Sequence, residues 1–346
     1  MRAIVMHAYG GPEVLVEEDW PTPSPAPGEA LVRLVGAALN RADLFGRIGH
    51  SAPHIKRPSL PHIPGVDGAG EVVAVGDPAD EAWVGRRAVV FGAVLCGRCA
   101  ACTGGDEMHC ERYRLVGEHV AGTLAEFIAV PVRNLVEVRS SRDLVQAAAL
   151  PAAYTTAWNM LELGGTRLGA WVGLVGASGG VAVAGLQLAR LWGATTVAIT
   201  SSPGKADRLR ALGADHVVVA PRDAFADGVR AIRPQGLDVV LNPVGGATWH
   251  DSVEALARGG TLALCGATDG DGPTISVRQI YQLRRRIVGA PLGPIRQLRA
   301  IVELFDAGRL EPAIDRVFRL DQTAEAHRYM EAGSFVGKVA VRVAAS

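Results

Sequence analysis

Charge imbalance, aromatic side chains and an uninterrupted apolar segment are all scarce or absent in this sequence. Its 346 residues include 35 Lys and Arg against 35 Asp and Glu, so no net charge attracts nucleic acid or an anionic membrane. Aromatic residues make up only 5%, which argues against stacking on nucleotide bases. The charge-free stretch 168–189 is interrupted by six glycines, and residues 1–20 lack the apolar core of a signal peptide. We therefore expect a cytoplasmic protein with a small-molecule substrate and neither a nucleic-acid nor a membrane partner.

Cysteine is also scarce, and its distribution is uneven. Four of the five cysteines fall within fifteen residues, as Cys96, Cys99, Cys102 and Cys110. This odd count does not suit a secreted disulfide framework, whereas four thiolates complete the tetrahedral shell of a structural zinc ion. We predict one such zinc per chain in a lobe at residues 92–112, with His109 as an alternative ligand; four unrelated reduced cysteines are the alternative to a metal site. Cys265 stands apart and is expected to be a core thiol near the cofactor.

The spacing of apolar residues divides the chain into two parts. Before residue 147, short apolar runs between Gly and Pro predict a small barrel of short strands. After it, strands alternate with helices, the pattern of an α/β fold with a parallel, doubly wound sheet. The expected strands are 170–175, 196–200, 216–219, 237–241 and 261–265, with helices at 205–212, 248–258 and 295–307 and two last strands at 316–320 and 338–343.

A glycine-rich turn follows the first of these strands and opens an apolar helix. Its residues are Gly176, Ala177, Ser178, Gly179, Gly180 and Val181. Glycines permit the tight turn and let backbone N–H groups approach a pyrophosphate, while the helix N-terminus adds favourable partial charge. The turn therefore predicts a dinucleotide site, and a glycine turn without a ligand is the alternative.

The residues after the second strand bear on the choice of cofactor. A free ribose 2′-hydroxyl usually meets an Asp or Glu at this point. Here Thr200, Ser201 and Lys205 occupy the region, and no acidic residue occurs between Gly176 and Asp207. Hydroxyls and a lysine suit a 2′-phosphate, so we predict NADPH. A polar loop with a solvated lysine is the alternative.

Further motifs, together with the cysteine cluster and the glycine turn, cover nearly the whole chain. They are LNRAD (39–43), IPGVDGAG (63–70), LPAAYTTAW (150–158), LGAD (212–215), NPVGG (242–246) and GKV (337–339). Jointly they resemble the medium-chain dehydrogenase/reductase superfamily, and specifically its quinone-oxidoreductase-like branch.

The resemblance implies a fold and a set of contacts. It implies a GroES-like β-barrel catalytic domain at residues 1–146 and 291–346, and a Rossmann cofactor domain at residues 147–290, with a cleft between them and a homodimeric assembly. It also implies cofactor contacts at Thr156, Asn242, Val244, Gly266, Ala267 and Lys338.

Departures from the family pattern concern the catalytic metal. Where zinc alcohol dehydrogenases carry a Cys, a His-Glu pair and a further Cys, the matching positions here are Asn40, Val66-Asp67 and Ala153 or its neighbour Tyr154. These residues cannot together hold zinc. Without zinc to lower the pKa of an alcohol, hydride delivery to an already polarised acceptor is the easier reaction. We therefore expect an NADPH-dependent reductase of a quinone or an α,β-unsaturated carbonyl.

Two residues are candidates for the chemistry. Asn40 either donates to the oxygen that gains negative charge or serves as a turn residue or cofactor contact. Asp43 either relays the final proton or caps the helix that begins beside it. His50, His54 and His62 are expected in a loop that borders the substrate, where they are solvated, face the substrate or form a metal site with Asp67. Tyr154 and Trp158 are packing residues or a substrate platform.

Three other functions are compatible with the sequence. The scaffold also suits an alcohol or aldehyde reductase, or a tailoring enzyme of secondary metabolism. It further suits an NADPH-binding sensor or structural protein with little turnover. The segments 46–62 and 278–294 are expected to line the acceptor pocket, but their residue types do not identify the substrate.

Overall fold

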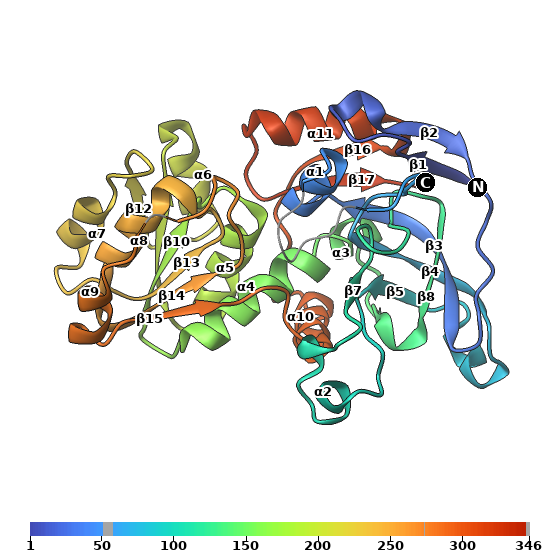
Figure 1. Cartoon of the computed structure of the whole chain (residues 1–346), viewed down its shortest axis with the longest axis horizontal. Helices are drawn as coiled ribbons and strands as arrows, with labels where there is room; N and C mark the ends of the chain where they lie inside the picture. Colours follow the sequence, from blue (N-terminus) through green and yellow to red (C-terminus); the bar gives the residue numbers. More distant parts are fainter. Residues whose placement is uncertain (51–57, 273, 344–346) are drawn as a thin grey trace. The chain divides into compact units, whose positions relative to one another are not determined.

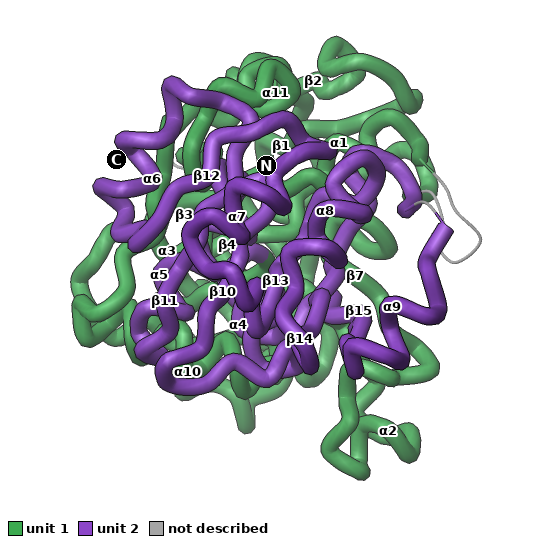
Figure 2. Tube along the Cα trace, turned by 90° about the vertical axis from the view of Figure 1, so that its left-hand side faces the viewer, with its two compact units in different colours: residues 1–152, 294–346 green, residues 153–293 purple. Residues whose placement is uncertain are grey.

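The chain divides into two compact units, seen in the computed structural model, which describes residues 1–50, 58–272 and 274–343 (Figures 1 and 2). Unit 1 comprises residues 1–152 and 294–346, and unit 2 comprises residues 153–293. Their boundaries lie a few residues beyond those expected from the sequence. Unit 1 is therefore built from two stretches of chain, and unit 2 is an insertion between them.

Unit 1 is organised around a seven-stranded sheet. Its strands run in the order β16-β17-β3-β4-β5-β9, and β8 pairs with the first half of β3. The sheet elements are β3 (Glu29–Ala38), β4 (Asp67–Val75), β5 (Arg87–Val90), β8 (Phe127–Pro131), β9 (Leu135–Glu137), β16 (Ile314–Arg319) and β17 (Lys338–Arg342). Smaller pairs join β1 (Arg2–Val5) to β2 (Val16–Asp19) and β6 (Ala93–Val94) to β7 (Arg114–Leu115).

Alternating burial along β3 explains where the core of unit 1 sits. Ala30, Val32 and Leu34 point to the same face of the strand and are fully buried. Burying a valine or leucine side chain contributes about 1.5–3 kcal/mol. At its other end β3 pairs antiparallel with β17, so the C-terminal stretch completes this core (Figure 1).

The helices of unit 1 lie around this sheet. α10 presents Leu298, Ile301, Val302 and Phe305, all buried, at the spacing of one helix face. The helices are α1 (Arg41–Arg47), α2 (Ala100–Thr103), α3 (Leu144–Ala147), α10 (Ile295–Asp306) and α11 (Thr323–Ala332), with 3₁₀ turns η1 (Pro12–Val14), η2 (Pro78–Trp83), η3 (Glu107–His109), η4 (Val132–Asn134) and η7 (Leu320–Gln322).

Unit 2 is a six-stranded parallel sheet in the order β12-β11-β10-β13-β14-β15. The chain starts at the central strand β10, moves outward to β12, and then returns to β13 on the other side. This reversal next to β10 is the feature of the Rossmann fold that creates a ligand crevice. The strands are β10 (Trp171–Val175), β11 (Thr195–Thr200), β12 (His216–Val219), β13 (Leu237–Asn242), β14 (Leu256–Leu264) and β15 (Arg286–Gly289).

Helices cover both faces of this sheet. Gly185 of α5 lies against Leu174 and Leu241 on one face. Val175 and Val240 point the other way, into a cluster with Phe225 and Val229 at α7 and Val253 of α8. The helices are α4 (Pro151–Gly164, beginning in unit 1), α5 (Gly180–Leu191), α6 (Ala206–Ala211), α7 (Ala226–Ile232), α8 (Trp249–Glu254) and α9 (Val277–Gln282), with 3₁₀ turns η5 (Pro203–Lys205) and η6 (Gly246–Thr248). In the described part of the chain no helix is long and apolar enough to span a membrane.

One predicted helix is wrong in extent. The sequence predicted a helix over 248–258, but α8 ends at Glu254 and β14 already begins at Leu256. Leu256 is fully buried and pairs with Leu237 of β13, so sheet pairing overrides the continuing helical pattern. Such a tertiary contact cannot be read from local propensity.

Candidate functional site

The glycine turn in unit 2 has the geometry of a phosphate-binding loop. Gly176 follows β10 with φ +62°, and a Cβ built there would lie 2.8 Å from the Val244 side chain. Only glycine meets both conditions, because the left-handed backbone and the close neighbour each exclude a larger residue. Gly179 is the N-cap of the twelve-residue helix α5, which starts at Gly180. The free N–H groups of this first turn form a site for an anion.

Two neighbouring loops close the carboxyl edge of the sheet beside this turn. The Asp269 N–H donates to the Val244 carbonyl (2.9 Å), and the Gly246 N–H donates to the Gly270 carbonyl (2.8 Å). A Cβ at Gly245 would lie 3.1 Å from the Cα of Ala267, so the loops after β13 and β14 are in contact. The predicted cofactor residues Val244, Gly266 and Ala267 thus lie in loops that follow adjacent strands.

Asn242 holds one of these loops in shape. Its Nδ2 donates to the hydroxyls of Thr248 (2.9 Å) and Ser252 (2.8 Å), and its Oδ1 accepts from the N–H groups of Val244 (2.8 Å) and Gly245 (3.0 Å). These bonds use both donors and both lone pairs of the buried amide. The observed role of Asn242 is therefore to position Val244 and Gly245, and its contact with a cofactor remains a prediction.

The residues predicted to select the cofactor come together at the ends of β10 and β11. Lys205 Nζ lies 3.2 Å from the Ser178 hydroxyl, so the lysine reaches back to the glycine turn. The Thr200 hydroxyl accepts from the Ser202 N–H (3.2 Å) at the end of β11, and Ser201 is exposed beside it. Of the remaining predicted contacts, Ala177 is buried, while Val181 in α5 and Thr156 in α4 are half-buried.

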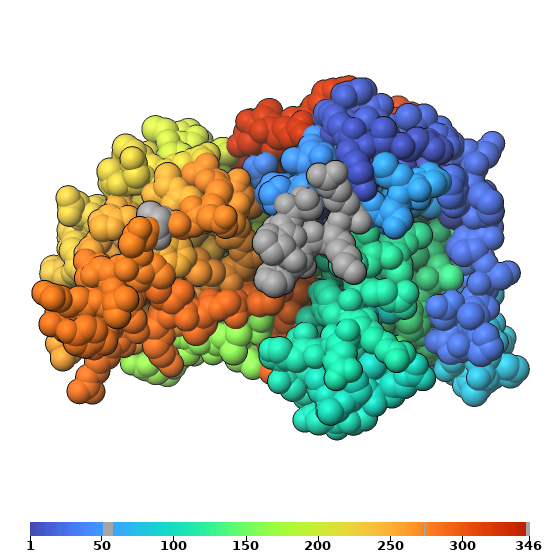
Figure 3. All heavy atoms as spheres, viewed as in Figure 1, coloured from blue at the N-terminus to red at the C-terminus, as the bar shows by residue number. Residues whose placement is uncertain are grey.

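The four clustered cysteines form a second candidate site, in unit 1. We call residues 92–112 the cysteine lobe, whose atoms are turquoise at the bottom of Figure 3. Its four sulfur atoms, from Cys96, Cys99, Cys102 and Cys110, all lie within 4.8 Å of one another. Backbone N–H groups point at two of them: Cys99 N lies 3.4 Å from Cys96 Sγ, and Cys96 N lies 3.3 Å from Cys110 Sγ. Hydrogen bonds from the N–H groups of Arg98 and Cys99 lower the pKa of Cys96 to about 6.

This arrangement fits a structural zinc ion. Four thiolates satisfy a tetrahedral metal and leave no open position for a substrate. In the described residues this is the one group of three or more His, Cys, Asp or Glu side chains placed to share an ion. His109 is exposed and pairs with Asp106 (2.8 Å), so it stands apart from the sulfur cluster. A zinc ion here would fix the lobe without taking part in the reaction.

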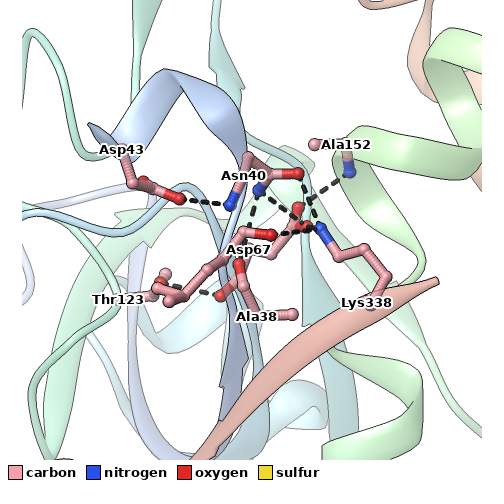
Figure 4. A network of polar contacts seen from close by, with 8 residues as sticks. Ala38, Asn40, Asp43, Asp67, Thr123, Ala152 and Lys338 are labelled. Carbon is pink, nitrogen blue, oxygen red and sulfur yellow. Dashed lines mark hydrogen bonds and ion pairs between the residues drawn. The ribbon is translucent and has the colours of Figure 1, made fainter. Parts of the chain in front are cut away.

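A buried polar network in unit 1 centres on Asp67, the first residue of β4 (Figure 4). One carboxylate oxygen accepts the Ala152 N–H (2.8 Å). The other accepts Asn40 Nδ2 (3.0 Å) and Lys338 Nζ (3.0 Å). Asp67 is 0% and Lys338 4% exposed, so this ion pair is shielded from water. The carboxylate is thus engaged by three protein donors, one of them a full positive charge.

Lys338 connects the two stretches of chain that form unit 1. Besides Asp67, its ammonium group donates to the Leu39 carbonyl (2.8 Å) and to Asn40 Oδ1 (2.6 Å). These three bonds occupy all three of its N–H donors. Lys338 therefore serves the network in this structure, and the predicted cofactor contact remains a prediction.

Asn40 and Asp43 both lie at the start of α1. Asn40 is the N-cap residue, and its backbone N–H donates to the Asp43 carboxylate (2.6 Å). Asp43 therefore caps the helix, one of the two roles considered for it. Its other oxygen, Oδ1, is buried and has no hydrogen-bond partner. Burial raises the pKa of Asp43 to about 7, and the negative charge of Asp67 adds to the effect.

The raised pKa of Asp43 predicts a pH-dependent stability. In the unfolded chain an aspartate has a pKa near 3.9, so the folded state holds the proton more tightly. Unfolding then releases a proton, and stability falls as the pH rises from about 4 to about 7. Asp43→Asn keeps an acceptor oxygen but cannot ionise. Its unfolding temperature, relative to the parent protein, should be higher at about pH 8 than at about pH 5.

Asp77→Asn provides the control for this measurement. Asp77 also caps a turn, accepting the Ala79 N–H (2.9 Å), but it lies nearer the surface. If the unfolding temperatures of both variants, relative to the parent protein, changed equally between the two pH values, the burial of Asp43 would not be the cause of the pH dependence.

The loop histidines do not form a metal site in the described structure. His62 is buried rather than solvated, and its Nε2 lies 2.8 Å from the Gly117 carbonyl. Burial lowers the pKa of His62. His50 is exposed and contacts the Phe45 ring, whereas His54 lies outside the described residues. Tyr154 is buried in α4 and bonds to Gln187 (2.7 Å), which is a packing role.

Comparisons with known proteins fit this geometry. Residues 26–140 match the family described as alcohol dehydrogenase GroES-like domain, and residues 212–341 match the family described as zinc-binding dehydrogenase. The chain is 30% identical over 348 residues to 2-methylene-furan-3-one reductase of Solanum lycopersicum, covering 99% of this chain and 79% of that protein. This chain belongs to the medium-chain dehydrogenase/reductase superfamily. The predicted two-domain α/β fold is confirmed, and the protein is an oxidoreductase.

Two other proteins are similar over almost the whole of this chain. A solved structure titled NAD-dependent alcohol dehydrogenase has a TM-score of 0.92 and 36% identity, covering 99% of this chain and all of that one. The synaptic vesicle membrane protein VAT-1 homolog of Rattus norvegicus is 28% identical, covering 98% of this chain and 83% of that protein. Members of this superfamily bind NAD(P) and structural zinc, and the four clustered cysteines of this chain fit a zinc ion.

Sequence reasoning missed one functional relationship, the pairing of Asp67 with Lys338. Asp67 was considered as an inadequate zinc ligand and Lys338 as a cofactor contact. The two residues are separated by 271 positions, and only the antiparallel pairing of β17 with β3 brings them together. The one available signal was that both are charged residues in otherwise apolar or glycine-rich segments.

Proposed function

We propose that this protein is an NADPH-dependent reductase that delivers hydride to a quinone or an α,β-unsaturated carbonyl without a catalytic zinc ion. The single observation that carries the proposal is the hydrogen bonding of the Asp67 carboxylate. Its carboxylate accepts bonds from Ala152, Asn40 and Lys338, so its oxygens are turned to protein donors. The Lys338 ammonium supplies the positive charge that a metal would otherwise supply at this carboxylate.

The other positions that match zinc ligands also lack suitable atoms. Val66 and Ala153 are buried apolar residues, and the Tyr154 hydroxyl is bonded to Gln187. Asn40 offers an amide, which is a poor zinc ligand. Oxidation of an unactivated alcohol has no group here to lower the pKa of the hydroxyl, whereas reduction of a polarised double bond does not need one.

Asn40 and Asp43 have complementary roles in this proposal. The Asn40 amide makes its longest bond, 3.3 Å, to the Ala38 carbonyl. We propose that this N–H turns to the acceptor oxygen as negative charge develops there. With a pKa raised to about 7 by burial, Asp43 holds a proton near neutral pH and supplies it to the reduced product. The bound nicotinamide would supply the hydride.

The polar residues near the end of β11 favour NADPH over NADH as the cofactor. Lys205 and Ser178 lie 3.2 Å apart, and Ser201 is exposed beside them, so a lysine and hydroxyls are gathered where a 2′-phosphate would lie. The tomato relative supports the acceptor class, because a 2-methylene-furan-3-one is a conjugated ketone. The solved relative titled NAD-dependent alcohol dehydrogenase makes alcohol oxidation with NAD the second candidate.

The test is an acceptor panel on protein with a measured metal content. We expect NADPH consumption with enones or quinones by protein that holds about one zinc per chain. Alcohol oxidation with NAD should be slower by orders of magnitude. Turnover that requires a second metal ion, or activity with alcohols alone, would refute the proposal.

Lys205→Ala should separate the two cofactors. Removing the charge-assisted bond to a 2′-phosphate costs about 1.5–3 kcal/mol, which corresponds to a KM for NADPH that is higher by about 10- to 150-fold. The KM for NADH should change less than about threefold, because NADH has no phosphate at that position. Equal effects on both cofactors would show that Lys205 does not bind the 2′-phosphate. Arg190→Ala, a basic residue at the far end of α5, is the matched control.

A further inference from the structure

A pocket beside the cysteine lobe is not used by the proposed reaction. It has a volume of about 510 Å³ and lies wholly within unit 1. Its walls come from both strands at the base of the lobe and from η4. The lining residues are Val94, Leu95, Cys96, Arg98, Arg112, Tyr113, Arg114 and Arg133. The volume is in the range of small-molecule sites, which is about 300–1,000 Å³.

Four of these eight lining residues are arginines, and none is acidic. Val94 of β6 pairs antiparallel with Arg114 of β7, so the strand that leads into the lobe lies beside the strand that leads out of it. Arg133 enters from η4, and its guanidinium donates to the Leu95 carbonyl, which fixes it at the rim. In the ranges that the structure describes, the exposed side chains of Arg98, Arg112 and Arg114 have no ion pair or hydrogen bond with protein.

The acids of the lobe and the zinc site together do not account for all of this positive charge. The lobe's Asp106 pairs with His109 (2.8 Å), and its Glu107 accepts the Ile295 N–H at the start of α10 (3.1 Å). Glu111, the third acid of the lobe, is exposed next to Arg112 in the sequence and offsets one of the four positive charges. A zinc ion with four thiolates would carry a net charge of about −2, so four guanidinium groups exceed the zinc site and Glu111 together by about one charge. Unpartnered like charges held around one pocket repel one another unless an anion joins them.

We propose that this pocket binds an oligophosphate, either free or as part of a small phosphorylated molecule. Planar guanidinium forks match phosphate oxygens in pairs, and four of them suit a chain of two or three phosphates rather than a single anion. Tyr113 adds a phenol, and Val94 and Leu95 give the pocket apolar walls. The proposal is independent of the proposed reaction, because the cofactor turn lies in unit 2.

The test is calorimetric titration of the zinc-loaded full chain with inorganic tripolyphosphate at about 0.15 M salt. With the glycine turn filled by NADPH, we expect one saturable site per chain. The double variant Arg112→Gln/Arg114→Gln should bind at least about tenfold more weakly, since it loses two charge-assisted contacts. Its zinc content and unfolding temperature should match those of the parent protein, which shows that the lobe is still folded. Arg112→Lys should bind tripolyphosphate with an affinity between those of the parent protein and the double variant, because lysine keeps the positive charge but lacks the planar guanidinium group that can donate two parallel hydrogen bonds.

Two control variants distinguish this pocket from other sources of binding. Arg309→Gln removes an exposed arginine of unit 1 that does not line the pocket, and it should leave the affinity unchanged. Lys205→Ala should also leave it unchanged, because Lys205 lies at the glycine turn. The proposal would be overturned if tripolyphosphate showed no saturable site, or if citrate bound equally tightly. It would also be overturned if Arg309→Gln lowered the affinity for tripolyphosphate as much as the double variant does, or if only Lys205→Ala abolished binding.

Discussion

Cys110→Ser is expected to abolish zinc binding and to lower the unfolding temperature of the protein by about 10 °C or more. Cys110 is the one buried cysteine of the cluster, and its sulfur accepts N–H groups from Cys96 (3.3 Å) and Arg112 (3.4 Å). The lobe has little core of its own, because α2 has four residues and η3 has three. In small domains of this kind metal binding contributes about 10–16 kcal/mol, so its loss unfolds them.

Cys265→Ser is the matched control. Cys265 lies in unit 2, and burial raises the pKa of its thiol to about 12, so it remains protonated. This variant should keep about one zinc per chain. Metal analysis after gel filtration and thermal unfolding give the two readouts. If Cys110→Ser kept its zinc, or if chelation left the unfolding temperature unchanged, the cluster would not be a structural metal site.

Lys338→Met is expected to destabilise the folded protein by about 3–5 kcal/mol. The substitution keeps the length of the side chain but leaves the Asp67 carboxylate buried without its positive partner. Asn40 Oδ1 and the Leu39 carbonyl also lose a donor. The penalty is large because a buried charge without its partner has neither water nor an ion pair to stabilise it. Urea unfolding monitored by circular dichroism measures the change.

A double-mutant cycle shows whether the ion pair is the cause. Lys338→Met/Asp67→Asn removes both charges, so it should be less destabilised than the sum of the single variants by at least about 1 kcal/mol. Arg319→Met removes an exposed partner of Asp321 and should cost less than about 1 kcal/mol. A small effect of Lys338→Met, comparable to that of Arg319→Met, would contradict the importance of the network.

Local patterns were sufficient to predict much of the fold. The alternation of apolar strands and helices after residue 147 predicted β10 to β14 in the right order, because each strand has its own run of valine, leucine or isoleucine. The spacing of Cys96, Cys99, Cys102 and Cys110 predicted their convergence, since the first three are three positions apart and the fourth follows only eight positions later in the same short loop.

Features that depend on distant parts of the chain were not predictable in the same way. Arg47 is 2% exposed, and its guanidinium contacts His327 (3.3 Å) and Glu331 on α11, some 280 positions later. Nothing local to Arg47 distinguishes it from a solvated arginine. The shortened helix α8 has the same origin, because Leu256 belongs to a strand only through its pairing with β13. The use of the Asn40 amide by Asp67 and Lys338 was likewise set by tertiary contacts.

The position of β17 also has a consequence for the newly made chain as it leaves the ribosome. β17 lies between β3 and β16, and both it and β16 are encoded after the whole of unit 2. The segment of β3 at residues 36–38 therefore presents unpaired backbone groups while unit 2, a single continuous stretch, is already able to fold. β17 must therefore be translated before that edge is covered, and until then the nascent chain is exposed to aggregation and to chaperones.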